Sequence, residues 1–219
     1  MPNNRIRQTL SSAAQNLSGP VAALAAQYGV LPGVWALAIA GGAGLLVTYA
    51  QLAEDRGKEL LDFIQEHQDE FVDTIVNSPE FITVFVNVWE LHIRETAENK
   101  RKRLRNFLLS LGSGQHIAQD LHTKIYSVIQ QMTDQEAAIF GILFNGSNRE
   151  QFRSMHINPS GFAGLSNYPD NEIKDAWHSL HAYRLIDVMD DGVVGGIMSL
   201  GQITPFGEMF YDRVVDGTI

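Results

Sequence analysis

The sequence contains no cysteine, and this absence excludes several kinds of chemistry at once. Disulfide bonds, cysteine-ligated zinc, iron–sulfur clusters and thiol catalysis all require cysteine. A chain without thiols is compatible with a reducing compartment. With 45% hydrophobic and 19% charged residues among its 219 positions, the sequence is typical of a folded protein rather than a disordered chain.

The sequence also lacks the common active-site motifs. It has no HExxH zinc motif, no glycine-rich phosphate-binding loop and no GxSxG nucleophile turn. His178 and His181 are three residues apart, but no carboxylate pattern accompanies them, so a metal site is not expected there. His92 lies in an apolar stripe and is expected to be a hydrogen-bonded core residue. We therefore predict a protein that is not an enzyme, with no catalytic residues, no cofactor and no metal.

Cations are scarce relative to anions. Lysine and arginine number 16 against 25 aspartates and glutamates, which gives a formal net charge of -9. The imbalance is largest from Thr133 to the end of the sequence, where 12 acidic residues accompany 5 basic ones. Since phosphate binding needs positive surface, a nucleic-acid partner is not expected.

Charge of either sign is missing from Gln8 to Ala53. Within this neutral head, which we place at 1–56, the run 33–52 reads GVWALAIAGGAGLLVTYAQL. As a helix, its 20 residues would span about 30 Å, the thickness of a hydrocarbon core. The features that suggest membrane insertion or helix association are two interfacial aromatics and a stripe of small residues four apart: Trp35, Tyr49, Ala36, Ala40 and Gly44. A helix buried in a bundle or in a dimer core is the alternative.

The middle of the chain, 57–114, is predicted to be a helical hairpin. Apolar spacing predicts a helix over 58–76, and Ser78 followed by Pro79 begins a second helix that extends to about Leu109. Gly112-Ser113-Gly114 should end it. A basic cluster in its C-terminal half is a candidate surface for a partner or an anionic membrane: Lys100, Arg101, Lys102, Arg103 and Arg105. The alternative is a solvated helix face whose cations pair with nearby glutamates.

The segment 115–219 has the element order of a winged helix-turn-helix domain. A helix over 116–132 is followed by a capping box, Thr133 to Glu136, and a short helix over 137–144. A third helix, capped by Asp170 or Asn171, leads into a strand over 185–188, a turn at 190–192 and a second strand that begins at Val193. Thr204 and Pro205 then begin a last helix. The predicted fold class is mainly α: an N-terminal apolar helix, a helical middle and a C-terminal winged-helix-like α+β domain.

Three short sequence motifs resemble those of a known protein family. They are TDQEAAIFGIL at 133–143, LHAYRLIDV at 180–188 and ITPFGEMF at 203–210. Together with the apolar head and the charged helix that starts at Glu95, they make the chain resemble bacterial proteins of the abortive-infection alpha type. The resemblance implies a closing winged-helix-like domain and a role in phage defence or stress response.

The expected third helix is poorly suited to reading DNA. Its basic residues are Lys174 and the following Arg184, against Asp170, Glu172 and Asp175. With Trp177, these two cations are our candidate contact residues in the third helix and wing. We therefore expect a non-enzymatic bacterial protein whose acidic domain binds a protein partner or self-assembles. We place it in the cytoplasm or at the inner membrane, with the C-terminal domain in the cytoplasm. The alternative is a soluble winged-helix transcriptional regulator that binds DNA.

Overall fold

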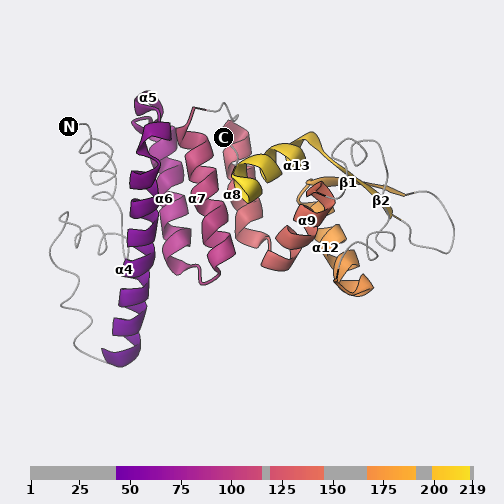
Figure 1. Ribbon diagram of the computed structural model, residues 1–219, viewed down its shortest axis with the longest axis horizontal. Helices are drawn as coiled ribbons and strands as arrows, with labels where there is room; N and C mark the ends of the chain where they lie inside the picture. Colours follow the sequence, from indigo (N-terminus) through magenta and orange to yellow (C-terminus); the bar gives the residue numbers. More distant parts are fainter. Residues whose placement is uncertain (1–42, 115–118, 146–166, 191–198, 218–219) are drawn as a thin grey trace. The chain divides into compact units, whose positions relative to one another are not determined.

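The computed structural model describes residues 43–114, 119–145, 167–190 and 199–217. Within these ranges the protein is mainly helical and contains one small sheet of two antiparallel strands, so the mainly α fold class is confirmed (Figure 1). The chain divides into two compact units, Met1–His122 and Thr123–Ile219. We call them unit 1 and unit 2 and describe each by itself.

Helix α4 (Ala43–Glu66) does not end where the sequence led us to expect. The apolar helix was predicted to end at Leu52, but α4 continues through the charged residues 54–56 without a break. The reason is packing, because a stripe of buried positions at spacings of four, three and four residues occupies one face of the helix. These buried residues are Ala53, Gly57, Leu60 and Ile64.

The helix predicted over 58–76 is also wrong at its C-terminal end. Helix α4 ends at Glu66, and a 3₁₀ turn, η1 (Gln68–Glu70), and one turn of helix, α5 (Asp73–Val76), follow it. The side chain of Phe71 packs directly on Gly112, and the Val72 amide donates a hydrogen bond of 2.8 Å to the Gly112 carbonyl. These contacts redirect the chain, since a continuing helix could not make them.

The predicted membrane span falls mostly on positions for which little structure is described. Trp35, Ala36 and Ala40 lie outside the described residues, and Gly44 and Tyr49 lie in α4 without described side chains. Among the helices that the structure does describe, none combines the length and the apolar character needed to cross a bilayer. The span over 33–52 stays a prediction.

The long helix expected from Pro79 to about Leu109 is two helices. Helix α6 (Pro79–Arg94) begins as predicted, with Ser78 Oγ accepting a hydrogen bond of 3.2 Å from the Phe81 amide. The backbone becomes extended at Glu95 and Ala97, and α7 (Glu98–Gly112) follows. The Glu95 side chain accepts a hydrogen bond of 2.9 Å from the Ala97 amide, which stabilises this turn. Helices α4, α6 and α7 therefore lie side by side in unit 1 (Figure 1).

The buried face of α6 is the one predicted from the apolar stripe. Helix α7 ends at Gly112, and Gly114 has a φ of 81°, so the expected glycine stop is confirmed. On α6, the buried residues are the six that the sequence pattern indicated: Phe81, Phe85, Val88, Trp89, His92 and Ile93.

The predicted capping box joins α8 (Gln119–Gln131), whose first residues belong to unit 1 and whose remainder belongs to unit 2, to the next helix. After α8, Thr133 Oγ1 accepts a hydrogen bond of 3.1 Å from the Glu136 amide. In return, Glu136 Oε2 accepts one of 2.7 Å from the Thr133 amide, at the start of α9 (Asp134–Asn145). The next described helix is α12 (Asp170–Ala182), whose cap position is occupied by Pro169, not by Asp170 or Asn171.

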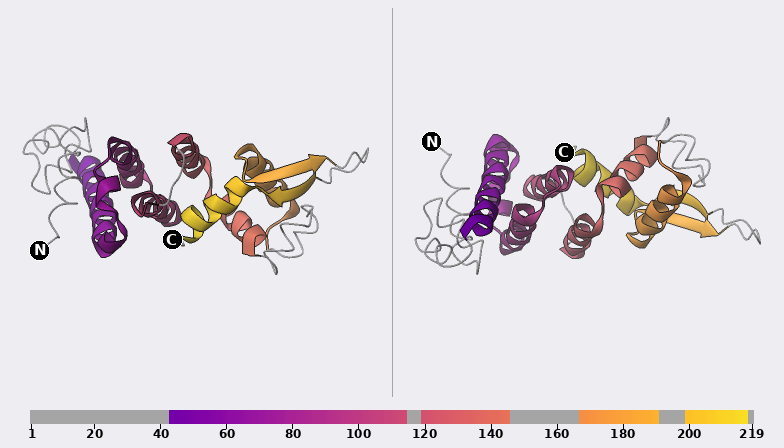
Figure 2. Two further views of the ribbon diagram at one scale, coloured as in Figure 1. Left: turned by 90° about the horizontal axis from the view of Figure 1, so that it is seen from above. Right: turned by 90° about the horizontal axis from the view of Figure 1, so that it is seen from below.

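The predicted hairpin is present in its described part. Strand β1 (Ile186–Asp190) pairs antiparallel with β2 (Ser199–Ile203) (Figure 2). The register places Asp190 opposite Ser199. Asp190, predicted to open the turn, is paired within β1, whereas the rest of the predicted turn and the predicted strand start at Val193 lie outside the described residues. The aspartates and glycine at 190–192 favour a turn locally, but register is set by the pairing of the whole strands.

The last helix starts as the sequence predicted. Thr204 Oγ1 accepts a hydrogen bond of 2.8 Å from the Gly207 amide at the start of α13 (Pro205–Phe210), and a π-helical turn, η2 (Tyr211–Asp216), continues it. A Cβ on residue 207 would collide with the Leu185 carbonyl, so only glycine allows this close approach. The ring of Tyr211 stacks on Phe144 with centroids 3.8 Å apart, which ties the C-terminal turn to α9.

Candidate functional site

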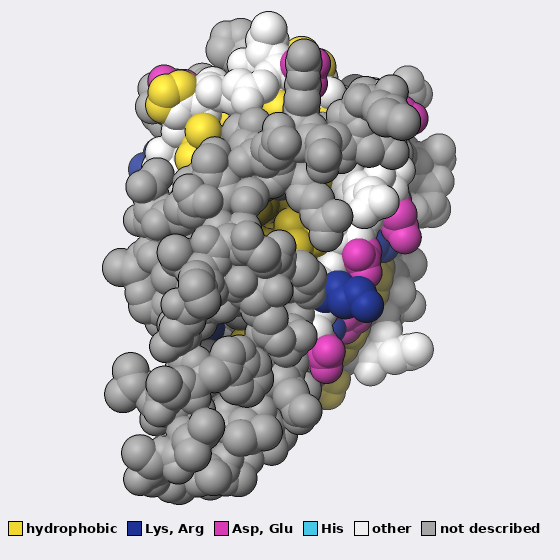
Figure 3. Space-filling view, turned by 90° about the vertical axis from the view of Figure 1, so that its left-hand side faces the viewer, with side chains coloured by type: hydrophobic (Ala, Val, Ile, Leu, Met, Phe, Trp, Pro, Cys, Tyr) yellow, Lys and Arg dark blue, Asp and Glu magenta, His cyan; other side chains and the backbone are white. Residues whose placement is uncertain are grey.

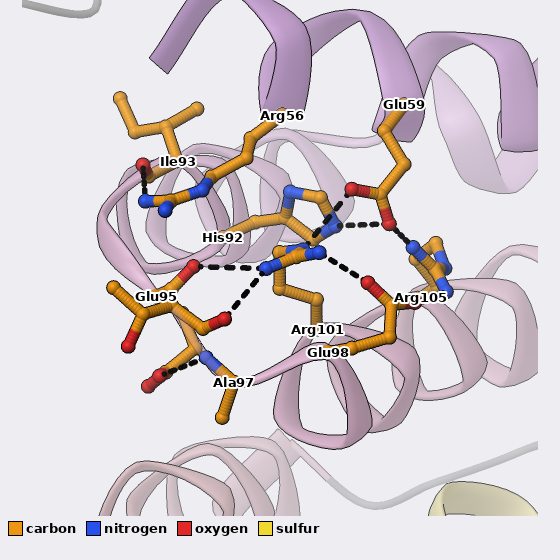
Figure 4. Close-up of polar contacts among 10 residues, drawn as sticks. Arg56, Glu59, His92, Ile93, Glu95, Ala97, Glu98, Arg101 and Arg105 are labelled. Atoms are coloured by element: carbon orange, nitrogen blue, oxygen red, sulfur yellow. Dashed lines mark hydrogen bonds and ion pairs between the residues drawn. The ribbon is translucent and has the colours of Figure 1, made fainter. Parts of the chain in front are cut away.

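A cluster of charged side chains joins α4, α6 and α7 in unit 1. Its centre is Glu59 of α4, whose Oε2 accepts a hydrogen bond of 3.0 Å from Arg101 Nε and whose Oε1 forms an ion pair with Arg105 (Figure 4). Glu98 pairs with the same two arginines, at 2.8 Å from Oε1 to Arg105. We call Glu59, Glu98, Arg101 and Arg105 the ion-pair cluster; its two carboxylates balance its two guanidinium groups.

The ion-pair cluster also fastens the C-terminal end of α6. Arg101 donates hydrogen bonds to the carbonyl oxygens of Glu95 and Thr96, at 3.2 and 3.1 Å. From the other side, Arg56 of α4 donates one of 3.1 Å to the carbonyl of Ile93. The last carbonyls of a helix lack partners within the helix, so these guanidinium groups supply bonds that α6 cannot make itself.

The five residues of the predicted basic cluster have different environments. Arg101 and Arg105 belong to the ion-pair cluster, and Lys100 lies 3.4 Å from the Glu95 carboxylate. Arg103 is buried, with 4% of its surface exposed. Lys102 is the member whose side chain is exposed. Most of the positive charge is therefore compensated within unit 1, and Lys102 is the member that is open to solvent.

Glu95 shows the strength of this local compensation. Burial alone would raise the pKa of its carboxyl, but the Ala97 amide and the Lys100 ammonium outweigh burial and lower the pKa. Acidic side chains lie beside basic ones elsewhere too, and the face drawn in Figure 3 shows described side chains of both signs close together.

His92 is the buried titratable group of this region. Its side chain is fully buried, and burial lowers the pKa of the imidazole to about 4, assisted by the positive charges of Arg101 and Arg56. Glu59 Oε1 lies 3.9 Å from Nε2, and neither ring nitrogen has a hydrogen-bond partner in the described structure. The expected core position is confirmed. An imidazole without access to solvent cannot serve as a general base for an outside substrate.

The outer face of α12 is the second candidate site. The helix buries Ile173, Ala176, Trp177 and Leu180 and turns its other side to solvent. The predicted contact residue Trp177, at 1% exposure, is a core residue and cannot contact a partner. Lys174 and Arg184 are exposed, as a contact role requires. The exposed side chains of α12 are Asp170, Asn171, Lys174, Asp175, His178, His181 and Ala182.

Several participants in these sites were missed at the level of sequence. Arg56 and Glu59 lie one helical turn apart beside the buried stripe of α4, a spacing that marks them as partners for a neighbouring helix. If the break after Arg94 had been predicted, α7 would have been expected to run back along α6. Arg101 would then have been expected near α4. Across the ranges that the structure describes, no group of three or more histidines, aspartates and glutamates has the arrangement of a metal site.

Comparisons of the chain with protein-family models, with curated proteins and with solved structures give no match. The resemblance to the abortive-infection alpha type therefore rests on the sequence words at 133–143, 180–188 and 203–210.

Proposed function

We propose that the protein is a non-enzymatic bacterial interaction protein. Unit 2, interpreted as a winged-helix-like domain, binds another protein chain or a second copy of itself. The apolar segment 33–52 associates with the inner membrane and leaves unit 2 in the cytoplasm. The resemblance to the abortive-infection alpha type favours a role in phage defence or stress response.

The observation that carries this proposal is the charge on the outer face of α12. Asp170 and Asp175 are exposed there, and Lys174 is the exposed cation between them. Asp187 on β1 is exposed as well, so the strand after the helix adds another negative charge. Such a face repels a duplex and attracts a protein surface rich in lysine and arginine.

Binding to a lysine- and arginine-rich peptide tests the proposal. Full-length protein in detergent should bind a fluorescent peptide of this kind, with affinity that falls as salt rises. Asp170→Asn combined with Asp175→Asn should weaken binding about fivefold, because two charges are removed without a change of shape. Asp69→Asn combined with Glu70→Gln removes two exposed charges from unit 1 and should leave the affinity unchanged. Equal affinities for all three proteins would exclude α12 as the binding face.

A DNA-binding regulator is the second candidate, and the exposure of Lys174 and Arg184 is the observation that favours it. It predicts retardation of duplex DNA at low salt, lost on Lys174→Glu combined with Arg184→Glu. Absence of retardation at low salt would exclude this candidate.

Membrane association is tested by placing charge in the apolar segment. Ala36→Lys combined with Ala40→Lys should release the protein from membranes in a carbonate wash, since each lysine costs about 3 kcal/mol at the centre of a span. These substitutions lie outside α4, so they leave the packing of its buried stripe intact. The matched control, Ala36→Leu with Ala40→Leu, should stay in the membrane fraction. Equal release of the lysine variant and the control would contradict membrane insertion.

A further inference from the structure

Two cations of unit 2 are held beside the same helix start. Lys124 of α8 places its Nζ 3.6 Å from the centroid of the Phe206 ring, in the first turn of α13. Arg184 lies in the turn between α12 and β1, and its carbonyl oxygen accepts a hydrogen bond of 2.8 Å from Thr204 Oγ1. Since Thr204 caps the helix turn that contains Phe206, the ammonium of Lys124 and the backbone of Arg184 both lie at this turn.

The two positive charges influence each other. Burial lowers the pKa of the Lys124 ammonium, and the charge of Arg184 lowers it further. Arg184 is exposed and Lys124 is half-buried, so the area is open to solvent. Two like charges brought together raise the free energy of the folded state unless an anion lies near both.

No carboxylate from the described part of unit 2 forms an ion pair with Lys124 or Arg184. Residues 123–219 contain 12 acidic and 6 basic side chains, so carboxylate partners are abundant in this unit. The carboxylate of Glu136 is engaged by the Thr133 amide and by the hydroxyl of Tyr183. An acidic unit that nevertheless brings two basic residues to one turn, close enough for their charges to interact, has the charge arrangement of an anion-binding site.

The backbone of Arg184 is held in one unusual conformation. Its φ is 60°, in the left-handed region that side chains rarely adopt, and it is the non-glycine residue with positive φ among those described. The hydrogen bonds from Thr204 Oγ1 to the carbonyls of residues 184 and 185 hold this turn in place. The Phe206 ring holds the ammonium of Lys124 by a cation–π contact.

We propose that Lys124 and Arg184 form a binding site for an oxyanion of the phosphate class. The guanidinium group offers paired donors and the ammonium a point charge, a combination suited to phosphate oxygens. The phosphate belongs either to a small molecule or to a nucleic-acid backbone. The site does not depend on which partner the outer face of α12 binds.

Calorimetric titration of the full-length protein with inorganic phosphate, at constant ionic strength set by chloride, tests this site. Saturable binding in the millimolar range is expected. Lys124→Met keeps an apolar stem over Phe206, and Arg184→Asn suits a positive φ, so both variants should fold. Each should weaken phosphate binding about tenfold, the effect of losing one charge-assisted hydrogen bond. Lys174→Met, which removes an exposed cation from α12, should have no effect.

A second titration, with a 20-base-pair DNA duplex, distinguishes the two sources of phosphate. Duplex binding that both variants weaken assigns the site to a nucleic-acid backbone, whereas phosphate binding without duplex binding assigns it to a small molecule. Absence of saturable heat with both probes, or equal binding by the two variants and the parent, overturns the proposal. Circular dichroism of each variant confirms its fold, and either variant alone is sufficient for the comparison.

Discussion

Replacing His92 should remove a specific part of the acid sensitivity of unit 1. The imidazole is fully buried on α6 and faces Arg56 and Glu59 of α4 and Arg101 of α7. Burial is the main reason that its pKa lies at about 4, and the two arginines add to the effect. A protonated His92 would be a third cation in a place where Glu59 is the nearby carboxylate.

The direction of the pH effect follows from the two pKa values. The unfolded chain takes up this proton near pH 6.5, whereas folded His92 stays neutral to about pH 4. The stability linked to His92 is therefore complete above pH 6.5, declines as the pH falls below it and is lost once the pH passes about 4. At about 1.4 kcal/mol per pH unit, the interval between the two values corresponds to about 3 kcal/mol.

The assay compares the parent with His92→Leu, which fills a similar volume and cannot titrate. Urea unfolding is carried out at pH 7.5, 6, 5 and 4.5. It is monitored through the hydrogen exchange of peptides from α6, which reports the unfolding of unit 1 alone. The stability of the parent should fall relative to the variant by about 2–3 kcal/mol across this range. Titration of Glu95, whose lowered pKa belongs to both proteins, cancels in the difference. A difference constant to within about 0.5 kcal/mol would refute the assignment of a depressed pKa to buried His92.

Three further substitutions have defined outcomes. Gly207→Ala should destabilise unit 2 by about 3 kcal/mol or more, measured by thermal unfolding, because its Cβ meets the Leu185 carbonyl and backbone cannot give way. Glu59→Gln should destabilise unit 1 by about 1–3 kcal/mol in urea unfolding, since Arg101 and Arg105 lose the less exposed of the two carboxylates that they share. Gly44→Leu should reduce the oligomer mass in detergent by light scattering, if small residues of the apolar segment let helices approach closely.

Matched controls separate these effects from general damage. In Gly141→Ala the new Cβ would lie 3.8 Å from Tyr211 Cε2, an ordinary contact, so this variant should be as stable as the parent or more so. Glu66→Gln removes an exposed carboxylate from the same helix as Glu59 and should change stability by less than about 0.5 kcal/mol. Leu45→Ile leaves the small residues in place and should leave the oligomer mass unchanged. Equal effects in a substitution and its control would contradict the contact in question.

Local signals in the sequence were the ones that predicted structure well. The caps at Ser78, Thr133 and Thr204 and the stop at Gly112 act through hydrogen bonds within a few residues, so they could be recognised in advance. The apolar stripe of α6 was equally visible, because a period of 3.6 residues needs no knowledge of the partner helix.

Features that depend on distant contacts could not be predicted. The sequence after Arg94 favours a helix, but the backbone there is extended. Hydrogen bonds from Arg101 and the packing of α7 along α6 stabilise this turn. The end of α4 depends on Phe71 meeting Gly112, some 40 positions later. The register of the hairpin likewise depends on β2, whose glycine-containing sequence SLGQI gives a weak strand signal. The ion-pair cluster was missed for the same reason, since Glu59 can be recognised as an ion-pair partner only when α7 is known to lie beside α4.

The guanidinium bonds at the end of α6 have a mechanical consequence. A helix end normally frays first, but here Arg56 of α4 bonds a carbonyl in the final turn of α6 and Arg101 of α7 bonds the carbonyl of the C-cap residue Glu95. Neither neighbour can move away without releasing carbonyls that then have no donor. A force applied along α4 is thus carried into the bend between α6 and α7, and the three helices yield together.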